Sequence, residues 1–450
     1  MLLFLCSLCA AFLLIVLLYK RNEKVGYLCF SAAFLIPSLF LPEFVPGGVK
    51  SVSAGGGPLY NLLLVASQGL FLTVALFSIP KEPEPKPLRK FLNSGGRSAT
   101  LFFGLTLLLM QLISAYTSSP RVIPLITIFL FTFSIIIARQ MSFEKFYDSI
   151  ERVFLFIAVV VLLGILLRFE WGSADQYSSL YESGVYFSPF GSVLGLPVRV
   201  AGPFGSAQDL GIFCSMGFAL VIFNNVKSSL RVIFCSLIFI FLGSLTGSRT
   251  FYITIFIAIC LNSVYYLSKK YTSSYLPLAI LSFVVVYIVV SELFLPTISS
   301  TSNVKEIGGR SLLWQTIFQH WSDNGLFGQG PNTLSAYMKA RLGFWQYGHA
   351  HNSMLQYLWD FGILGVVSFT LFLISWIVTM ASRKHGGLKQ LGVFLTFMTI
   401  QSEISFEIDL RFKGLLVMFF YLALIDVRPF TSSTYKEEMN KDIATESHEK

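Results

Sequence analysis

Long apolar runs alternate with short polar stretches along almost the whole chain. Each run is about 17 to 25 residues long, enough for a helix to cross roughly 30 Å of hydrocarbon. The runs lack the alternation of apolar and polar residues that marks a membrane β-strand. Backbone polar groups in lipid must be satisfied inside the segment itself, so the pattern predicts an all-α, polytopic integral membrane protein with about 12–13 transmembrane helices.

The apolar runs place thirteen spans. They cover residues 2–19, 25–41, 59–80, 98–117, 121–138, 153–169, 208–226, 231–246, 249–268, 275–295, 356–380, 390–406 and 411–427. The first run has no basic flank and no clear small-residue cleavage pattern, so it is predicted to be retained and not removed as a signal peptide. Together the spans form a single transmembrane domain, residues 1–430, followed by a polar tail over 431–450 that we expect to be disordered.

Basic residues mark the sidedness of the loops. Of the 33 Lys and Arg residues, 22 fall in loops that would share one side, including residues 81–97 and 139–152. Short loops rich in Lys and Arg stay in the cytoplasm, so these loops and the C-terminal tail are predicted to be internal. The N-terminus is then external; if the first run is not a span, the N-terminus is internal and the rest is unchanged.

Composition supports the membrane class and excludes others. The chain is 54% hydrophobic and only 13% charged, as a polytopic membrane protein requires. Its net charge of +9 is divided among short loops and forms no single basic stripe, so no nucleic-acid partner is expected. All six cysteines lie in predicted spans, which leaves none to form a disulfide in an outer loop.

Two outer segments, residues 170–207 and 296–355, exceed ordinary connecting length. Loops this long are usually functional or disordered. The second is rich in Trp and Tyr, and Leu313, Ile317 and Trp321 recur at helical spacing, so it is predicted to be ordered and partly helical.

The helix in the second outer segment is predicted to begin near Gly309 or Arg310. We expect its apolar face to lie at the membrane surface. The Gly-rich stretch over 325–331 would end it.

Two histidines stand in a polar segment, residues 347–352, directly before the span at 356–380. Imidazole can accept a proton near neutral pH, so His351 is a candidate general base. A protonated His351 would instead stabilise negative charge, and a solvated loop histidine is the structural alternative. His349 is one residue away and faces another direction, so the two are not expected to share one role.

The residues around this pair resemble the O-antigen ligase and O-antigen polymerase superfamily, whose members have a GT-C type membrane fold. His351-Asn352, nine residues, Gly362, two residues and Gly365 match its His-Asn-x9-Gly-x2-Gly signature. Three further runs are similar to motifs of the same family. They are Gly309–Trp314 with Gly325–Pro331 before the histidine, Gly247-Ser248-Arg249 after a span, and Arg199–Phe204, which Ser206-Ala207-Gln208 follows in place of the commoner Asn-Pro-Asn.

The resemblance implies transfer of a glycan from an undecaprenyl-diphosphate carrier to an acceptor hydroxyl on the periplasmic face of the bacterial inner membrane. No cofactor, metal or nucleotide sugar is expected. The leaving diphosphate needs guanidinium groups, which bind phosphate oxygens in pairs and stay charged. The predicted catalytic residues are His351, Arg249 and Arg310, and the predicted diphosphate- or glycan-binding residues are Arg199, His349, Asn352, Arg341 and Trp314.

Other interpretations of these residues remain open. Each arginine could instead snorkel at a membrane interface. The Glu407-Ile408-Asp409 triplet has a form that binds divalent metals in other GT-C enzymes, but it sits beside Arg411 and arises easily by chance, so no metal site is predicted.

The predicted activity is polymerisation of lipid-linked repeat units, with ligation of the polymer to lipid A core as the near alternative and protein O-glycosylation as a third. A transporter or flippase is the alternative from another class, but such proteins tend to show pseudo-repeats and mid-membrane charges, which are not evident here. Membrane lipids, a chain-length regulator and a separate flippase are the other expected partners.

Overall fold

The computed structural model describes several parts of the chain together with a few single residues. The parts are residues 23–44, 58–79, 143–167, 202–204, 207–224, 229–271, 313–323, 325–331, 333–342 and 352–381, and the single residues include 200 and 350. Within them every regular element is helical and no strand occurs. This confirms the all-α fold class.

Seven described helices lie where apolar runs predicted spans. They are α2 (Glu23–Phe44), α4 (Pro58–Ser78), α8 (Phe143–Leu166), α11 (Ala207–Ile222), α12 (Ser229–Leu245), α13 (Arg249–Tyr271) and α17 (Ser353–Ala381). Two segments, Lys145–Leu166 and Met354–Ser375, are long and apolar enough to cross a membrane. The protein is therefore a helical membrane protein. The remaining predicted spans lie wholly or mostly outside the described residues, so the total of 12–13 stays a prediction.

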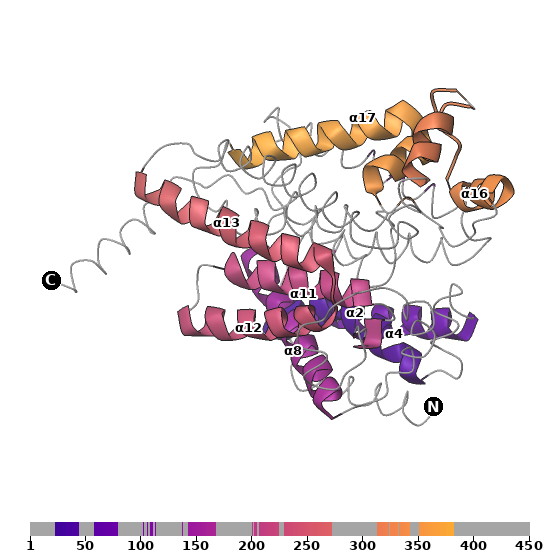
Figure 1. Ribbon diagram of the computed structural model, residues 1–450. Coiled ribbons are helices and arrows are strands. Elements are labelled where there is room, and N and C mark those ends of the chain that lie inside the picture. The colour runs from indigo at the N-terminus through magenta and orange to yellow at the C-terminus, as the bar shows by residue number, and fades with distance from the viewer. Residues whose placement is uncertain are drawn as a thin grey trace.

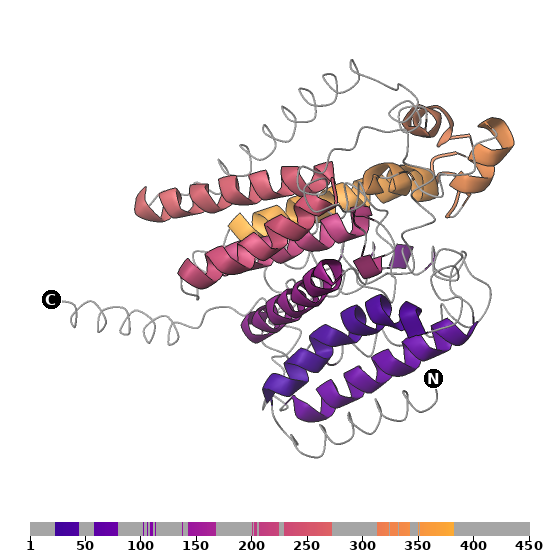
Figure 2. The same cartoon turned by 60° about the horizontal axis from the view of Figure 1, so that its bottom comes forward.

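The helices pack as a bundle. α2 and α4 lie side by side at one end, and α8, α11 and α12 form the centre (Figures 1 and 2). α13 packs against α11, and Tyr357, Phe369 and Phe372 of α17 belong to the same apolar core. Gly217 of α11 faces the Phe239 ring of α12 so closely that a Cβ atom would collide with it, which shows how near these two helices approach.

A group of phenylalanine rings joins the central elements. Phe154 of α8 stacks on Phe213 of α11 with ring centroids 4.6 Å apart. Phe204, in the short 3-10 helix η1 (Gly202–Phe204), lies 4.8 Å from Phe213, and Phe239 of α12 lies 6.2 Å away edge-on. Such ring pairs add to the stabilisation from apolar burial. They fix η1, and with it the chain that follows Arg199, on the core.

α8 begins ten residues before the span that hydropathy predicted at residues 153–169, inside the stretch assigned to an inner loop. The sequence Phe146, Ile150, Phe154, Ile157 and Val161 repeats at helical spacing, and all five side chains are buried. The charged residues between them lowered the local hydropathy but left the apolar face intact. The prediction of a loop over 139–152 is therefore wrong from Phe143 onward.

The predicted helix in the second outer segment is present, since residues 313–320 are helical and a turn follows to residue 323. Its apolar face does not lie at the membrane surface as expected. Leu313 and Ile317 are fully buried in a second apolar cluster with Trp359 of α17 and Met338 of α16 (Leu334–Leu342). An apolar face at helical spacing can pack either on the membrane or on other parts of the protein. Here it packs on the protein.

Candidate active site

Asn352, the second residue of the His-Asn signature, caps the N-terminus of α17. Its Oδ1 accepts a hydrogen bond from the Leu355 backbone N–H at 3.2 Å, and its carbonyl accepts one from the Gln356 N–H at 2.9 Å. Asparagine suits this position because it pairs an N–H group that a helix start otherwise leaves without a partner. The cap fixes the chain on the C-terminal side of His351.

Ala350 fixes the chain on the other side of His351. Its carbonyl accepts a hydrogen bond from the Trp314 indole N–H at 2.8 Å, and its N–H donates to Gln356 Oε1 at 2.8 Å. The Gln356 amide is itself oriented, because its Nε2 donates to Asp360 Oδ1 at 2.9 Å. Asp360 and Ala350 are buried, so these bonds are shielded from competing water. Together they form a clamp that holds the backbone as it enters His351.

α17 is broken at Gly362, the first glycine of the signature. This residue has φ 62° and ψ −146°, a backbone conformation open to glycine and strained for other residues. The polar groups released by the break are bonded to the loop over residues 325–331. The Ile363 N–H donates to the Leu326 carbonyl at 3.1 Å, and the Trp359 carbonyl accepts from the Gln329 N–H at 2.6 Å. Backbone hydrogen bonds therefore join the loop directly to α17 at the break.

Glycines permit the close approach of the loop and helix. A Cβ at Gly362 would collide with the Leu326 carbonyl. From the other side, a Cβ at Gly328, which has φ +80°, would lie 2.6 Å from the Gly362 nitrogen. The second signature glycine, Gly365, faces the Tyr357 carbonyl, which a Cβ would meet at 2.6 Å. The two signature glycines therefore have steric roles at the break.

The outer unit, defined as the helix over 313–320 with the turn to residue 323, the loop over 325–331 and α16, packs on the first turns of α17. Trp359 is fully buried at its centre. The Trp359 indole N–H donates to Thr333 Oγ1 at 2.9 Å, and the Tyr337 ring meets the Trp359 ring edge-on at 4.9 Å. The Gln329 side chain donates to the His320 carbonyl, which ties the loop to the preceding helix. The unit is ordered by these contacts.

The two other arginine motifs meet at one end of the bundle. The Val200 N–H, next to Arg199, donates to the Leu245 carbonyl at the end of α12 at 3.1 Å. From there the chain turns through Gly247, with φ 60°, and Arg249 is the first residue of α13. The Ser248 N–H donates to Thr246 Oγ1 at 3.1 Å within this turn. The backbones of both motifs are therefore held close together.

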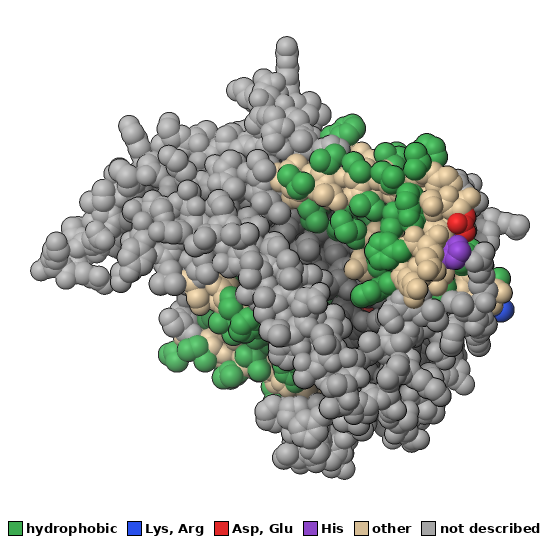
Figure 3. Space-filling view, turned by 45° about the horizontal axis from the view of Figure 1, so that its top comes forward, with side chains coloured by type: hydrophobic (Ala, Val, Ile, Leu, Met, Phe, Trp, Pro, Cys, Tyr) green, Lys and Arg blue, Asp and Glu red, His purple; other side chains and the backbone are tan. Residues whose placement is uncertain are grey.

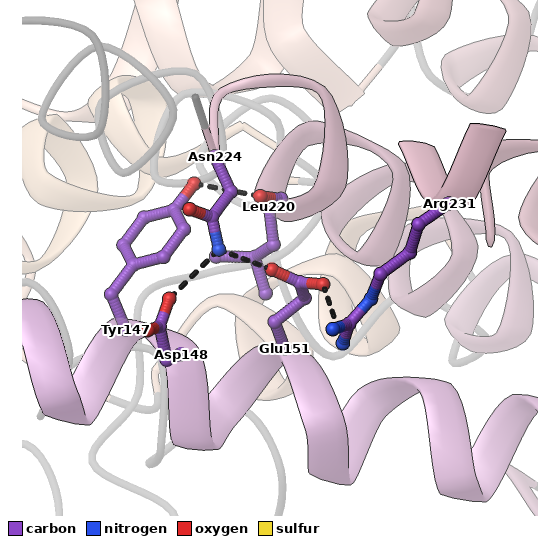
Figure 4. Close-up of polar contacts among 6 residues, drawn as sticks. All are labelled: Tyr147, Asp148, Glu151, Leu220, Asn224 and Arg231. Carbon is purple, nitrogen blue, oxygen red and sulfur yellow. Dashed lines mark hydrogen bonds and ion pairs between the residues drawn. The ribbon is translucent and has the colours of Figure 1, made fainter. Parts of the chain in front are cut away.

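A buried polar network lies at the other end of α11 (Figure 4). The Asn224 amide Nδ2 donates to Asp148 Oδ1 at 2.8 Å and to Glu151 Oε2 at 2.5 Å. Glu151 is 1% exposed, and its other oxygen lies 3.8 Å from the half-exposed guanidinium of Arg231. The Tyr147 hydroxyl donates to the Leu220 carbonyl at 3.0 Å. α11 has 16 residues and is about 24 Å long, so this network is far from the arginine motifs and joins α8, α11 and α12.

The structure places some of the predicted site residues. Trp314 and Asn352 are placed with their side chains, Trp314 on the Ala350 carbonyl and Asn352 at the start of α17. Arg249 and Arg341 are placed by their backbones, at the start of α13 and in the last turn of α16. The residues outside the described part of the chain are Arg199, Arg310, His349 and His351. The substrate and catalytic roles of all eight stay predictions.

Gln356 and Asp360 were missed by sequence analysis. They follow Asn352 at intervals of four residues, which puts all three on one face of α17 inside an otherwise apolar run. That spacing was the available signal. Among the described residues, no three His, Cys, Asp or Glu side chains form a group that could hold a metal ion, and the Glu407–Asp409 pair lies outside them.

The fold and the motif-bearing segments define a helical membrane protein in which an outer unit packs on a broken helix. Residues 233–370 match the family model described as O-antigen ligase. This match confirms the resemblance to the O-antigen ligase and polymerase superfamily, and it covers most of α12, all of α13, the outer unit and the signature. It supports a glycosyl-transfer enzyme of the O-antigen ligase or polymerase type without separating the two. No curated protein matches the chain in sequence.

Proposed function

We propose that the protein polymerises undecaprenyl-diphosphate-linked repeat units into O-antigen or a related surface polysaccharide, on the periplasmic face of the bacterial inner membrane. The observation that carries the proposal is the family match over residues 233–370, which includes the complete His351–Gly365 signature. In this arrangement residues 1–430 form one transmembrane domain, and the outer segments 170–207 and 296–355 bring the reacting groups together. The tail over 431–450 is cytoplasmic.

The proposed reaction forms one C–O bond and breaks another. An acceptor hydroxyl oxygen attacks the anomeric carbon of the donor glycan, and undecaprenyl diphosphate leaves with the bonding electrons. His351 accepts the hydroxyl proton or, when protonated, stabilises the leaving charge. Arg199, Arg249 and Arg310 bind the diphosphate, and His349 and Arg341 supply further contacts to the donor.

Local contacts support this assignment. The clamp on Ala350 and the cap by Asn352 fix the backbone on both sides of His351, and catalytic groups act only when held in a narrow range of positions. The hydrogen bond from Val200 to Leu245 brings the Arg199 and Arg249 motifs to the same end of the bundle, as one anionic ligand requires. Trp314 bonds to Ala350, the residue before His351, and we assign its partly buried ring to packing against a sugar of the substrate.

Ligation of the polymer to lipid A core is the second candidate. It uses the same donor bond and the same residues, and the family description names this activity. The acceptor distinguishes the two. A polymerase transfers to a hydroxyl on another lipid-linked repeat unit, and a ligase transfers to a hydroxyl on the core.

The test is deletion of the gene in its host, followed by complementation with the wild-type chain or with His351→Ala. The surface lipopolysaccharide is then resolved on a gel. The polymerase proposal expects deletion and His351→Ala each to leave core carrying a single repeat unit. Bare core with polymer still on the lipid carrier identifies the ligase instead.

His320→Ala is the matched control, because His320 is the described histidine of the outer unit and its side chain contacts Asp323, away from the clamp. This variant is expected to restore the full ladder. An unchanged ladder after gene deletion would refute the glycan assignment and favour the transporter.

A further inference from the structure

The tip of the loop over 325–331 exposes two large apolar side chains. Leu326 is 64% exposed and Phe327 is 75% exposed. A polar loop end is the usual arrangement in water, and exposed apolar groups that adjoin a larger apolar surface mark an interaction site. The backbone position of Leu326 identifies the adjoining surface, because its carbonyl accepts the Ile363 N–H at the break in α17.

The tip extends an apolar stripe on α17. Ile363, Leu364, Val367, Leu371 and Ile374 are all exposed. After the adjacent pair 363 and 364 they recur at intervals of three or four residues, so all five share one face of the helix. All five lie within Met354–Ser375, which is long and apolar enough to cross a membrane. The space-filling view shows apolar side chains gathered over one face, with acidic and histidine side chains at its edge (Figure 3). Lipid is the medium that covers such a stripe on a membrane-crossing helix.

The break sets the depth of the tip. The part of α17 from Ile363 to Ala381 is about 28 Å long at 1.5 Å per residue, close to the roughly 30 Å of a hydrocarbon core. This arm is long enough to span the hydrocarbon by itself, whereas the turns before the break carry the polar Gln356 and Asp360 and pack on the outer unit. A span over the arm alone puts Ile363 at one boundary. Leu326 is bonded to that residue, so the loop tip lies at the same boundary.

We propose that Leu326 and Phe327 insert between the lipid acyl chains of the leaflet at the N-terminal end of α17. They act as an apolar finger that fixes the depth of the outer unit, and with it the segment that carries His351. The finger is continuous with the lipid-facing stripe of α17. The inference does not depend on the proposed glycan chemistry, since it rests on exposure, helix length and the bond between Ile363 and Leu326.

The test measures the contact of residue 327 with lipid. Phe327→Cys is labelled with bimane and reconstituted in phosphatidylcholine vesicles that carry lipids with a nitroxide near the head of the acyl chain. Ser322→Cys is the matched control, because Ser322 is exposed in the same outer unit, as Phe327 is. Labelled wild-type chain gives the background from native cysteines.

We expect bimane at 327 to be quenched at least twofold more than bimane at 322, with emission at shorter wavelength. Leu326→Cys should behave as Phe327→Cys does. Equal quenching at 322 and 327, whether weak or strong, would overturn the finger, because the tip would then share the environment of the rest of the outer unit. Neither result bears on whether the polymer ladder depends on His351.

Discussion

Ala350 carries no chemistry in its methyl group, yet its backbone determines how the chain enters His351. Its carbonyl belongs to the peptide bond that leads into His351, and Trp314 holds that carbonyl. Its N–H is held by Gln356, whose amide is oriented by Asp360. We therefore expect Gln356 and Asp360 to act as positioning residues for His351 through the backbone of Ala350.

Replacing Gln356 with Leu should lower the rate of glycan transfer strongly while the melting temperature changes little. The change removes the acceptor for the Ala350 N–H and the donor to Asp360, and small displacements of a reacting group lower rates on the order of 10- to 100-fold. Glycan-transfer rate and thermal unfolding are measured together. Gln315→Leu is the control, since Gln315 is exposed beside Trp314. Equal rates for the two variants would contradict a positioning role for Gln356.

Gly362→Ala should prevent correct folding of the outer unit. At φ 62° and ψ −146° a side chain costs about 1–3 kcal/mol in backbone strain, and the added methyl group would also collide with the Leu326 carbonyl. Gly325→Ala separates these effects, because Gly325 also has positive φ but a Cβ added there would meet nothing within 4 Å. The yield of folded protein and its melting temperature should fall far more for Gly362→Ala. Similar losses would show that the collision with the loop is unimportant.

Helix positions were largely predictable from hydropathy, and the departures have identifiable causes. α2, α4, α11, α12, α13 and α17 lie where apolar runs placed them. α8 begins ten residues before the predicted span. The prediction missed these residues because Asp148 and Glu151 lower the local hydropathy, although the buried apolar face continues through them. The break at Gly362 was hidden, since hydropathy carries no information on backbone dihedral angles.

The candidate site was predictable only in part. The motif spacing singled out His351 and Asn352, but the clamp depends on Trp314 reaching Ala350 across 36 positions of sequence. Such a contact is set by tertiary packing and leaves no local pattern. The polar network around Asn224 was missed for the same reason, since its members come from three separate helices.

That network should stabilise the packing of α8, α11 and α12. Asn224→Ala removes the amide that bonds to both Asp148 and Glu151, and loss of such bonds costs about 1–3 kcal/mol. Asn224→Asp should be worse near neutral pH, because it places a third carboxylate beside two others. Thermal unfolding in detergent gives the order, with wild type highest and Asn224→Asp lowest. Equal melting temperatures for Asn224→Ala and Asn224→Asp would show that repulsion among the carboxylates does not contribute.

At the scale of the whole molecule, the predicted sidedness puts the polar network around Asn224 and the outer unit on opposite faces of the membrane. Lys145, which is exposed in the first turn of α8, should lie on the cytoplasmic side, whereas Ser322 of the outer unit should lie on the periplasmic side. Single cysteines at these positions are treated with a membrane-impermeant maleimide. In intact spheroplasts only Ser322→Cys should react, and in inverted vesicles only Lys145→Cys. Reaction of both from one side would refute the assignment.

The break in α17 also bears on insertions and deletions in this chain. Asn352 caps the helix, Gln356 reaches Ala350, and Gly362 receives the loop, so three separate partners are aligned along one short stretch of helix. Adding or removing one residue between 352 and 362 would turn one end by about 100° and shift it by about 1.5 Å. No rotamer change compensates for such a rotation. The number of residues in this interval is therefore set by the three contacts, since a change of the count displaces all of them at once, whereas a substitution alters the contacts of one side chain.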